Sequence, residues 1–397
     1  MTIFDHVNET MRPDQLAQFQ LERLQALVAR LRRNVRWYRE SLSEARVESL
    51  AGVEKLPVTQ PEDLVAAFPY GMFAMPVHEV IRLHSTVGPE GRPLVIGHTR
   101  NDLTHWGRLV ARQLVAAGVT SNDLIQICFA GGVFSGAMGY MLGAETMEAS
   151  VIPEDPYHIE YQLAMLRSYR TTVLITTPTN AFELAELMSS RRVDPPSLSL
   201  RTLLLSRPIA AAERESLKSA LFADVRCSFG VPEILDPGFC VECEEGRFHV
   251  NEDQFLVETH DGQLLVTTLC REAMPLLRYA TRVSAELRRE RCGCGRTGAV
   301  LVPGVRRDGR LRVNEMPLYE AQIAAVLAQT RAAGHPFRVE IHEKRIVAFI
   351  EVADALFMDT MRTLADLKQE IQSEFMTRLG VDVEVRYVSP RTARDPA

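Results

Sequence analysis

Three cysteines and a histidine have the residue types and spacing that suit metal chemistry. Cys243 and His249 lie close together in the chain, and Cys292 and Cys294 flank a single glycine. Zinc takes thiolate and imidazole ligands in closed, four-coordinate sites, so this set predicts a structural zinc ion. Cys240 is a possible further ligand. The competing interpretation is two unrelated pairs of cysteines beside a surface histidine.

The stretch Ser85 to Pro93, S-T-V-G-P-E-G-R-P, resembles a phosphate-binding loop without its central hydroxyls. Gly88 and Gly91 flank a short turn, and Arg92 adds a positive charge. Glu90 places an anion where a phosphate would bind. Two like charges about 4 Å apart at an effective dielectric of about 20 repel each other by about 4 kcal/mol. We interpret the stretch as a phosphate loop with altered chemistry.

The elements that position these residues alternate between strand and helix. Strand patterns near 124–129, 150–153, 172–178, 202–206 and 224–230 are separated by helical patterns. Such alternation predicts a parallel sheet with covered faces. Ligands of open α/β sheets bind beyond the carboxyl ends of the strands. We therefore expect the loops after Phe129, Thr177, Ser206 and Gly230 to face the site.

The remaining segments complete a two-domain prediction. An amphipathic helix is expected over 14–45, a hairpin around the glycine loop, and a helix over 101–118 that Thr99 or Asn101 caps. Antiparallel strands follow from about residue 240. The tail predicts helices over 317–333 and 358–379 with strands over 337–342, 345–352 and 381–388. We predict an α/β fold: a large N-terminal domain, residues 1–307, with parallel sheets and a β-rich part, and a small mobile C-terminal α+β domain, residues 308–397.

Composition narrows the class of protein. The chain has 397 residues, a formal net charge of −6 and a pI of about 6.0, which does not favour binding to nucleic acid or an anionic membrane. It contains no run of about 18 apolar residues and begins without a signal-peptide pattern. Cys128, Cys227 and Cys270 lie in apolar segments and are expected in the core. We expect a cytoplasmic protein with reduced thiols.

Many ordered motifs make the chain resemble the phenylacetate–CoA ligase family of the adenylate-forming superfamily, over nearly its whole length. They include P-Y-G-M-F-A-M-P, G-H-T-R-N-D-L-T-H-W, F-G-V-P-E-I-L-D-P-G, R-E-A-M-P-L-L-R-Y-A-T-R and C-G-C-G-R-T. The resemblance implies that an aromatic or cyclic carboxylic acid reacts with Mg-ATP to form an acyl-adenylate. The acyl group then passes to the thiol of CoA or of a carrier protein. It also implies a homodimer and supports zinc at Cys243, His249, Cys292 and Cys294.

The resemblance assigns roles to individual residues. It implies that Glu233 binds Mg²⁺. The residues expected to contact the nucleotide are Gly88, Gly91, Arg92, Phe229, Gly230 and Arg282. The residues expected to line the acid pocket are Phe129, Gly131, Phe134, Gly136, Gly139, Ser206 and Pro237.

Several positions depart from the family pattern. Val283 replaces the carboxylate that binds the ribose, which removes charge-assisted hydrogen bonds worth about 1.5–3 kcal/mol each. No lysine follows Lys368, so the catalytic lysine has no counterpart, although Arg391 or Arg394 offers a cation. Arg207 stands where the family has an acidic or neutral residue. Arg207 either pairs with a local acid or anchors the carboxylate or phosphate of a ligand, with a catalytic role.

These departures leave three functions open. The first is an acid–thiol ligase. The second is an ATP-independent descendant that binds or transfers preformed acyl thioesters in a specialised biosynthetic pathway. The third is a non-catalytic scaffold that keeps only the fold and the zinc. Glu233, Arg92 and the pocket glycines favour the first, whereas Glu90 and Val283 favour the others.

Overall fold

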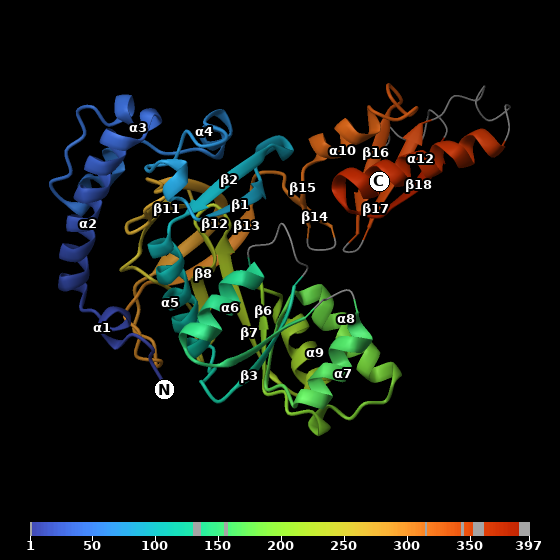
Figure 1. Ribbon diagram of the computed structural model, residues 1–397, viewed down its shortest axis with the longest axis horizontal. Coiled ribbons are helices and arrows are strands. Elements are labelled where there is room, and N and C mark those ends of the chain that lie inside the picture. Colours follow the sequence, from blue (N-terminus) through green and yellow to red (C-terminus); the bar gives the residue numbers. More distant parts are fainter. Residues whose placement is uncertain are drawn as a thin grey trace. The chain divides into compact units, whose positions relative to one another are not determined.

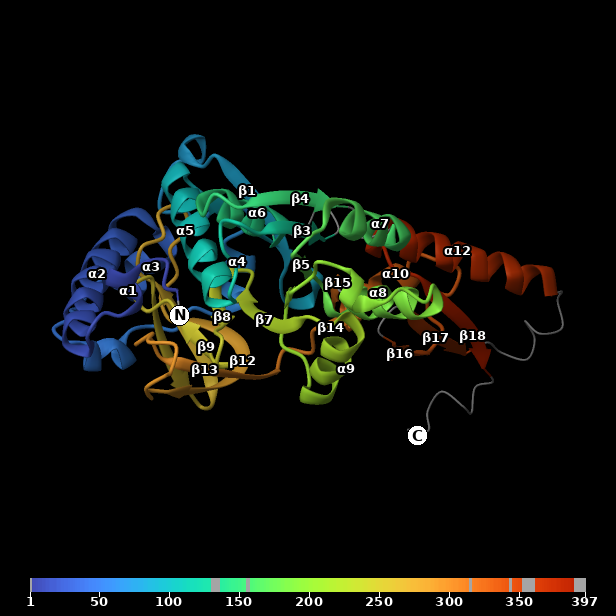
Figure 2. The ribbon, with the colours of Figure 1, turned by 90° about the horizontal axis from the view of Figure 1, so that it is seen from below.

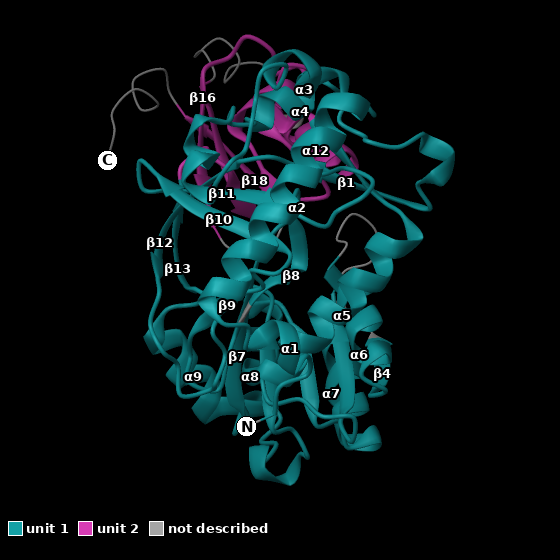
Figure 3. Cartoon of the chain, turned by 90° about the vertical axis from the view of Figure 1, so that its left-hand side faces the viewer, with its two compact units in different colours: residues 1–86, 93–306 teal, residues 87–92, 307–397 magenta. Residues whose placement is uncertain are grey.

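The computed structural model describes residues 2–129, 136–154, 158–313, 316–342, 345–351 and 361–388. The chain divides into two compact units (Figure 3). The large unit combines Met1–Thr86 with Pro93–Arg306, and the small unit combines Val87–Arg92 with Arg307–Ala397. Among the described helices, none has both the length and the apolar character that a membrane span requires.

A mixed sheet runs through the large unit (Figure 1). Its strand order is β10-β11-β12-β13-β9-β8-β7-β6-β5-β3-β4. The parallel part consists of β3 (Leu124–Cys128), β4 (Ser150–Glu154), β5 (Val173–Thr176), β6 (Thr202–Leu205) and β7 (Asp224–Val231). β5 and β6 are buried along their whole length and β3 along most of it, as strands covered on both faces are, whereas β4 at the end of the sheet is more exposed. The predicted parallel sheet is confirmed.

The sheet becomes antiparallel beyond β7. The strands of this part are β8 (Leu235–Glu242), β9 (Phe248–Val250), β10 (Phe255–His260), β11 (Gln263–Thr268), β12 (Tyr279–Arg288) and β13 (Val300–Arg306). β7 pairs in parallel with β6 and antiparallel with β8. One strand therefore joins the two parts, and the predicted antiparallel signals are confirmed.

Two groups of helices flank the parallel strands. α5 (Arg100–Ala116) packs on α6 (Gly136–Thr146), while α7 (Ile159–Tyr169), α8 (Pro178–Ser190) and α9 (Ala211–Leu221) pack in succession. Figures 1 and 2 show β3 and β7 between the two groups. Thr99 caps α5, because its Oγ1 accepts a hydrogen bond from the Asp102 N–H at 3.0 Å. In return, the Asp102 carboxylate accepts a hydrogen bond from the Thr99 N–H at 3.0 Å. The predicted cap at Thr99 is confirmed.

The N-terminal helix is interrupted, contrary to the prediction of one helix over 14–45. α1 (His6–Glu9) is followed by α2 (Pro13–Asn34) and α3 (Arg36–Ser41). Val35 between them has an extended backbone and is fully buried, and the Asn34 side chain donates to the carbonyl of Ala74 at 3.0 Å. Packing against residues distant in the chain thus overrides a continuous helical pattern.

Shorter elements complete the large unit. They are α4 (Pro61–Ala66), the 3₁₀ turns at Leu50–Lys55, Val77–Glu79 and Pro195–Ser197, and the strands β1 (Arg82–Val87) and β2 (Pro93–His98). β1 and β2 pair with each other, which confirms the predicted hairpin, and a 3₁₀ turn at Pro89–Gly91 joins them.

The small unit has its own core. Its elements are β14 (Leu311–Val313), β15 (Met316–Leu318), α10 (Glu320–Leu327), β16 (Phe337–Ile341), β17 (Ile346–Glu351), α12 (Met361–Leu379) and β18 (Val383–Val388). The predicted helix over 317–333 is wrong at both ends. Residues 316–318 pair with β14, so they are extended, and the helix begins only after Tyr319, whose N–H donates to Gln322 Oε1 at 3.0 Å. It ends at Leu327, before a series of turns.

Candidate functional site

The strands that precede three of the predicted site loops end side by side at one edge of the parallel sheet. Cys128 pairs with Thr176, and Thr176 pairs with Leu205, so the residues that follow these strands are neighbours. Thr177 caps α8 by accepting a hydrogen bond from the Asn180 N–H at 3.2 Å. Ser206 donates its N–H to the Thr176 carbonyl at 3.0 Å. Hydrogen bonds to main-chain groups therefore fix Thr177 and Ser206 at this edge.

The predicted acid-pocket residues are closely packed where the structure describes them. Phe129 stacks on Tyr140, with ring centroids 5.7 Å apart. A Cβ on Gly139 would lie 2.7 Å from the Trp106 ring and 2.8 Å from Pro237, so this glycine allows a close approach of helix and strand. Gly136 begins α6 and is buried. Gly131 and Phe134 lie outside the described residues.

Glu233 lies on the turn between β7 and β8. The strand register shifts between Phe229 and Val231, and the Ile234 N–H closes the turn on the Val231 carbonyl at 2.8 Å. Glu233 is only 4 % exposed, and no donor among the described residues reaches its buried Oε2. A buried carboxylate oxygen without a partner is unfavourable. A bound cation would satisfy it, and Mg²⁺ prefers such oxygen ligands.

The β7–β8 hairpin also fixes the neighbouring motif residues. The ring of Phe229 lies 6.1 Å from that of Phe239. A Cβ on Gly230 would lie 2.4 Å from a carboxylate oxygen of Asp236, so only glycine fits here without displacing that side chain.

The glycine loop uses its own N–H groups internally. Gly88 donates to the Arg92 carbonyl at 2.8 Å, Gly91 to Gly88 at 3.1 Å and Arg92 to Pro89 at 3.1 Å. Phosphate binding by these N–H groups therefore requires the loop to open. Arg92 and Glu90 form an ion pair at 3.8 Å with side chains 65 % and 73 % exposed. Solvent screens so exposed a pair, which makes the sequence-based estimate of repulsion too large.

Arg282 and Val283, where the family is expected to have a carboxylate that binds the ribose, contact other parts of the protein. Arg282 forms an ion pair with Glu62 at 2.8 Å. Val283 is buried in β12, opposite Arg306 of β13, and so belongs to the core. Arg207 lies half-buried in the segment after β6.

The cysteine and histidine residues form a cluster. Cys243 and His249 lie at the β8–β9 hairpin, and Cys292 and Cys294 lie between β12 and β13. Because β13 pairs with β9, the two segments meet, and the four ligand atoms lie within 4.8 Å of one another. Cys240 is not in this group of described residues and is fully buried in β8.

The protonation pattern of the cluster suits a metal. His249 Nδ1 lies 3.1 Å from the Gly298 carbonyl, which can only accept, so we assign the proton to Nδ1. Nε2 is then unprotonated and lies 3.4 Å from the sulfur of Cys294. A hydrogen bond from Cys243 outweighs burial and lowers the pKa of Cys294. A thiolate facing an imidazole lone pair needs a cation between them, and zinc fits.

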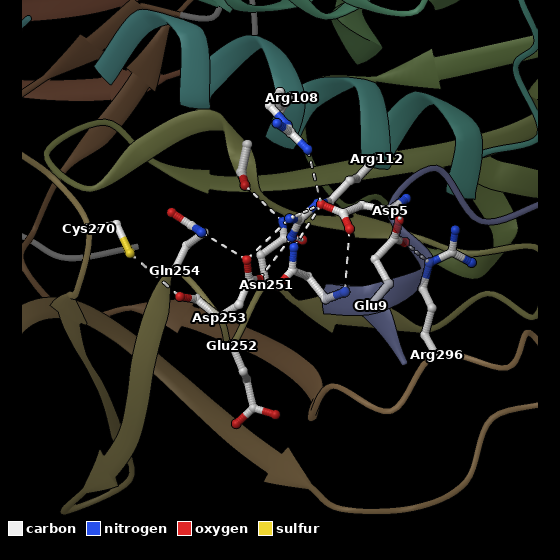
Figure 4. A network of polar contacts seen from close by, with 12 residues as sticks. Asp5, Glu9, Arg108, Arg112, Asn251, Glu252, Asp253, Gln254, Cys270 and Arg296 are labelled. Carbon is white, nitrogen blue, oxygen red and sulfur yellow. Dashed lines mark hydrogen bonds and ion pairs between the residues drawn. The ribbon is translucent and has the colours of Figure 1, made fainter. Parts of the chain in front are cut away.

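The N-terminal segment braces the segment that carries Cys292 and Cys294, and Figure 4 shows its Glu9 beside Arg296. Arg296 Nε donates to the Glu9 carboxylate at 2.7 Å, and the Thr297 N–H donates to the Glu9 carbonyl at 3.0 Å. Arg296 and Thr297 lie two and three positions after Cys294. Sequence reasoning missed this bracing, since no local pattern links residues so far apart.

Arg112 joins the same network from α5. It donates to the Asp253 carboxylate at 2.8 and 3.1 Å and to Asp5 at 2.7 Å. Burial favours the neutral form of Asp5, but hydrogen bonds from Asn8 and the charge of Arg112 outweigh burial and lower the pKa of Asp5. Burial likewise opposes the charge of Arg112, but both carboxylates raise its pKa.

Known proteins resemble both the C-terminal part of the chain and the chain as a whole. The family model described as the AMP-binding enzyme C-terminal domain matches residues 316–395. The chain is 32% identical to the phenylacetate-coenzyme A ligase of Thermus thermophilus, over 97% of this chain and 95% of that one. It is 28% identical to the phenylacetate-coenzyme A ligase of Escherichia coli, over 96% and 92%.

Solved structures show the same fold. A crystal structure of 2-hydroxyisobutyryl-CoA ligase in complex with 2-HIB-AMP and CoA matches with a TM-score of 0.88. The match covers 98% of this chain and 90% of that one, at 22% identity. An identity this low shows likeness of fold alone.

Replacing Arg112 by Met should destabilise the protein by about 3–5 kcal/mol at neutral pH, because two buried carboxylates lose their partner. Arg12→Met is the matched control, since the Arg12–Asp14 pair is 69% exposed on both sides and should contribute less than about 1 kcal/mol. Urea denaturation measures both.

The pH dependence has a definite sign. The pKa of Asp5 is lower in the folded protein than its usual value of 3.8, so the stability that Asp5 contributes is present above pH 3.8 and is lost as pH falls through the folded pKa. The gap between wild type and Arg112→Met should therefore narrow below that pH. An equal loss of stability in Arg112→Met and Arg12→Met would contradict this role of Arg112.

Proposed function

Because the chain belongs to the phenylacetate–coenzyme A ligase family, we propose that it activates a carboxylic acid with ATP and passes the acyl group to a thiol. We take the acid to be aromatic or cyclic, and the acceptor to be CoA or a carrier-protein thiol. The likeness to a ligase over 97% of the chain carries this proposal. The ATP-independent and scaffold alternatives are not favoured.

The proposed reaction has two steps. A carboxylate oxygen of the acid attacks the α-phosphorus of ATP, and pyrophosphate leaves. The thiol sulfur then attacks the acyl carbon, the thiol proton is lost, and AMP leaves. Each step needs positive charge near a developing negative charge.

Glu233 is the residue that we propose to hold Mg²⁺, because its Oε2 is buried without a partner among the described residues. When bound, Mg²⁺ would neutralise phosphate charge. Gly88, Gly91 and Arg92 would position phosphates once the loop opens. Phe229, Gly230 and Arg282 remain proposed contacts of the nucleotide, and Arg282 would have to leave Glu62.

Arg207 is our proposed source of positive charge in a chain without the family's lysine. The chain has only four lysines, the last at Lys368. Arg207 follows Ser206, at the sheet edge where the acid is expected. A guanidinium binds a carboxylate or phosphate through paired hydrogen bonds, so it would anchor the acid or its adenylate.

We also propose that Cys243, His249, Cys292 and Cys294 hold a structural zinc ion. All four ligands come from protein, so the ion would leave no open position for catalysis. A homodimer and a cytoplasmic location are further parts of the proposal, and both rest on the family and the sequence.

Metal analysis tests the zinc. Purified protein should contain about one zinc per chain, and Cys294→Ser should lose it and melt at a lower temperature, because metal binding contributes to folding. Cys270→Ser, outside the cluster, should keep the metal. A wild-type protein that neither contains nor takes up zinc would rule the site out.

Isotope exchange between pyrophosphate and ATP tests the activity. With a panel of aromatic and cyclic acids, at least one should support exchange by the wild type. Glu233→Gln should reduce the rate by about 100-fold or more, since an amide binds Mg²⁺ less well than a carboxylate. Unchanged exchange in Glu233→Gln would exclude the proposed role of this residue.

Arg207→Ala separates the two interpretations of that arginine. As a ligand anchor, Arg207 loses charge-assisted hydrogen bonds, so the dissociation constant of the activating acid should rise by about tenfold or more while the melting temperature stays the same. Arg207→Lys should restore part of the affinity. A fall in melting temperature without loss of affinity would instead make Arg207 a partner of a local acid.

A further inference from the structure

A buried arginine holds the turn that carries Glu233. Arg271 donates from one terminal nitrogen, Nη1, to the carbonyls of Glu233 at 3.0 Å and Ile234 at 2.6 Å. The turn lies where the β7–β8 register is broken, so the strand ladder alone does not fix it. The guanidinium supplies hydrogen bonds that the ladder lacks there.

Arg271 is itself fixed by two helices. Arg30 of α2 donates to the Arg271 carbonyl. At the start of α5, the Asp102 carboxylate accepts the N–H groups of Glu272 at 2.7 Å and Ala273 at 3.0 Å. The position of the guanidinium is therefore set by α2 and α5, outside the hairpin it supports.

The strand that follows the turn, β8, is also hydrogen-bonded to α5. Trp106 donates its Nε1–H to the Pro237 carbonyl at 2.6 Å. Arg271, Asp102 and Trp106 also line one small cavity together with Ile234 and Leu235. The main chain at Glu233 and the start of the strand that follows it are thus anchored to the same helix.

Burying this arginine is unfavourable by itself. Arg271 is 8% exposed, and its Nε and Nη2 have no hydrogen-bond partner among the described residues. Burial lowers its pKa, and only the charge of Asp102 opposes this. Because a buried, incompletely bonded charge is a poor source of stability, a positioning role explains it better.

We propose that Arg271 is a positioning residue for Glu233: it fixes the main chain from which the carboxylate reaches the divalent cation. This inference rests on the proposed function, because it requires Glu233 to bind that cation. It also gives α2 and α5 a part in metal binding, although neither supplies a metal ligand.

Arg278 provides a matched control. It is 3% exposed and also donates from Nη1 to two carbonyls, those of Glu54 at 2.9 Å and Leu56 at 2.7 Å. It does so away from the Glu233 turn. Arg278→Met and Arg271→Met therefore each remove a buried guanidinium that bonds two carbonyls, and Arg278→Met also removes an ion pair with Glu258. Only Arg271→Met removes support for Glu233.

The test is the affinity for Mn²⁺ in the presence of α,β-methylene-ATP, followed by the electron paramagnetic resonance of free Mn²⁺. Arg271→Met should weaken Mn²⁺ binding by about tenfold or more, as loss of support behind a metal ligand does. Arg271→Lys should restore part of the affinity, because an ammonium can still donate to both carbonyls. Arg278→Met should leave the affinity unchanged even where it lowers the melting temperature.

A double variant shows whether Arg271 influences Mn²⁺ affinity through Glu233. In a Glu233→Gln background, Arg271→Met should cause no further loss of Mn²⁺ affinity if it acts only through Glu233. An unchanged affinity in Arg271→Met, an equal loss in Arg278→Met, or a full additional loss in the double variant would overturn the inference. If Arg271→Met does not fold, Arg271→Lys and Arg271→Gln carry the same comparison.

The two proposals fail in different ways. A wild type that binds Mn²⁺ with the nucleotide but catalyses no pyrophosphate exchange contradicts the proposed function alone. A wild type that catalyses exchange but whose Mn²⁺ affinity does not depend on Arg271 contradicts only the positioning role. A wild type that binds no Mn²⁺ contradicts both assignments to Glu233.

Discussion

Buried guanidinium groups connect the distant segments of the large unit. Arg112, Arg271, Arg278 and Arg296 are each less than a tenth exposed. Each of them bonds carbonyl or carboxylate oxygens of distant segments, and because burying a charge without such acceptors is unfavourable, each arginine fixes where its acceptors lie. Arg296 joins the N-terminal segment to the segment that carries Cys292 and Cys294, and Arg112 joins it to Asp253. Arg271 joins α2 and α5 to the turn of Glu233. The two candidate sites therefore depend on the same kind of interaction.

The change of strand direction at β7 places the chemistry. β7 continues the parallel strands up to Cys227 and then starts an antiparallel hairpin at Ser228. The motif from Phe229 to Glu233 follows this change directly. In open α/β sheets, ligands bind where the topology changes. The same hairpin leads through β8 to Cys243 and His249, so the cysteine–histidine cluster belongs to the framework behind the proposed catalytic residues.

The parts of the fold that depend on local pattern could be predicted from the sequence. Short apolar strands between amphipathic helices predicted β3 to β7, and the side chains of Thr99 and Asp102 give a capping signal that needs no tertiary information. The break at Val35 could not be predicted, because it depends on burial and on a bond from Asn34 to Ala74. The strand at residues 316–318 was missed for the same reason, since it exists only through its pairing with β14.

The sites divide in a similar way. The four metal-binding candidates could be named because thiol and imidazole groups are rare and chemically distinctive. Arg271 and Arg112 could not, because an arginine in the sequence does not reveal which distant carbonyl or carboxylate it will meet. The exposure of Glu90 and its pairing with Arg92 could not be predicted either, since both are properties of the folded loop.

Calorimetric titration of the wild-type protein with Mg-ATP tests the central claim most directly, because it requires no knowledge of the acid. The account predicts binding in the micromolar range despite the altered glycine loop and Val283. No heat of binding up to millimolar Mg-ATP would contradict it, and the chain would then be an adenylate-forming fold that no longer uses ATP.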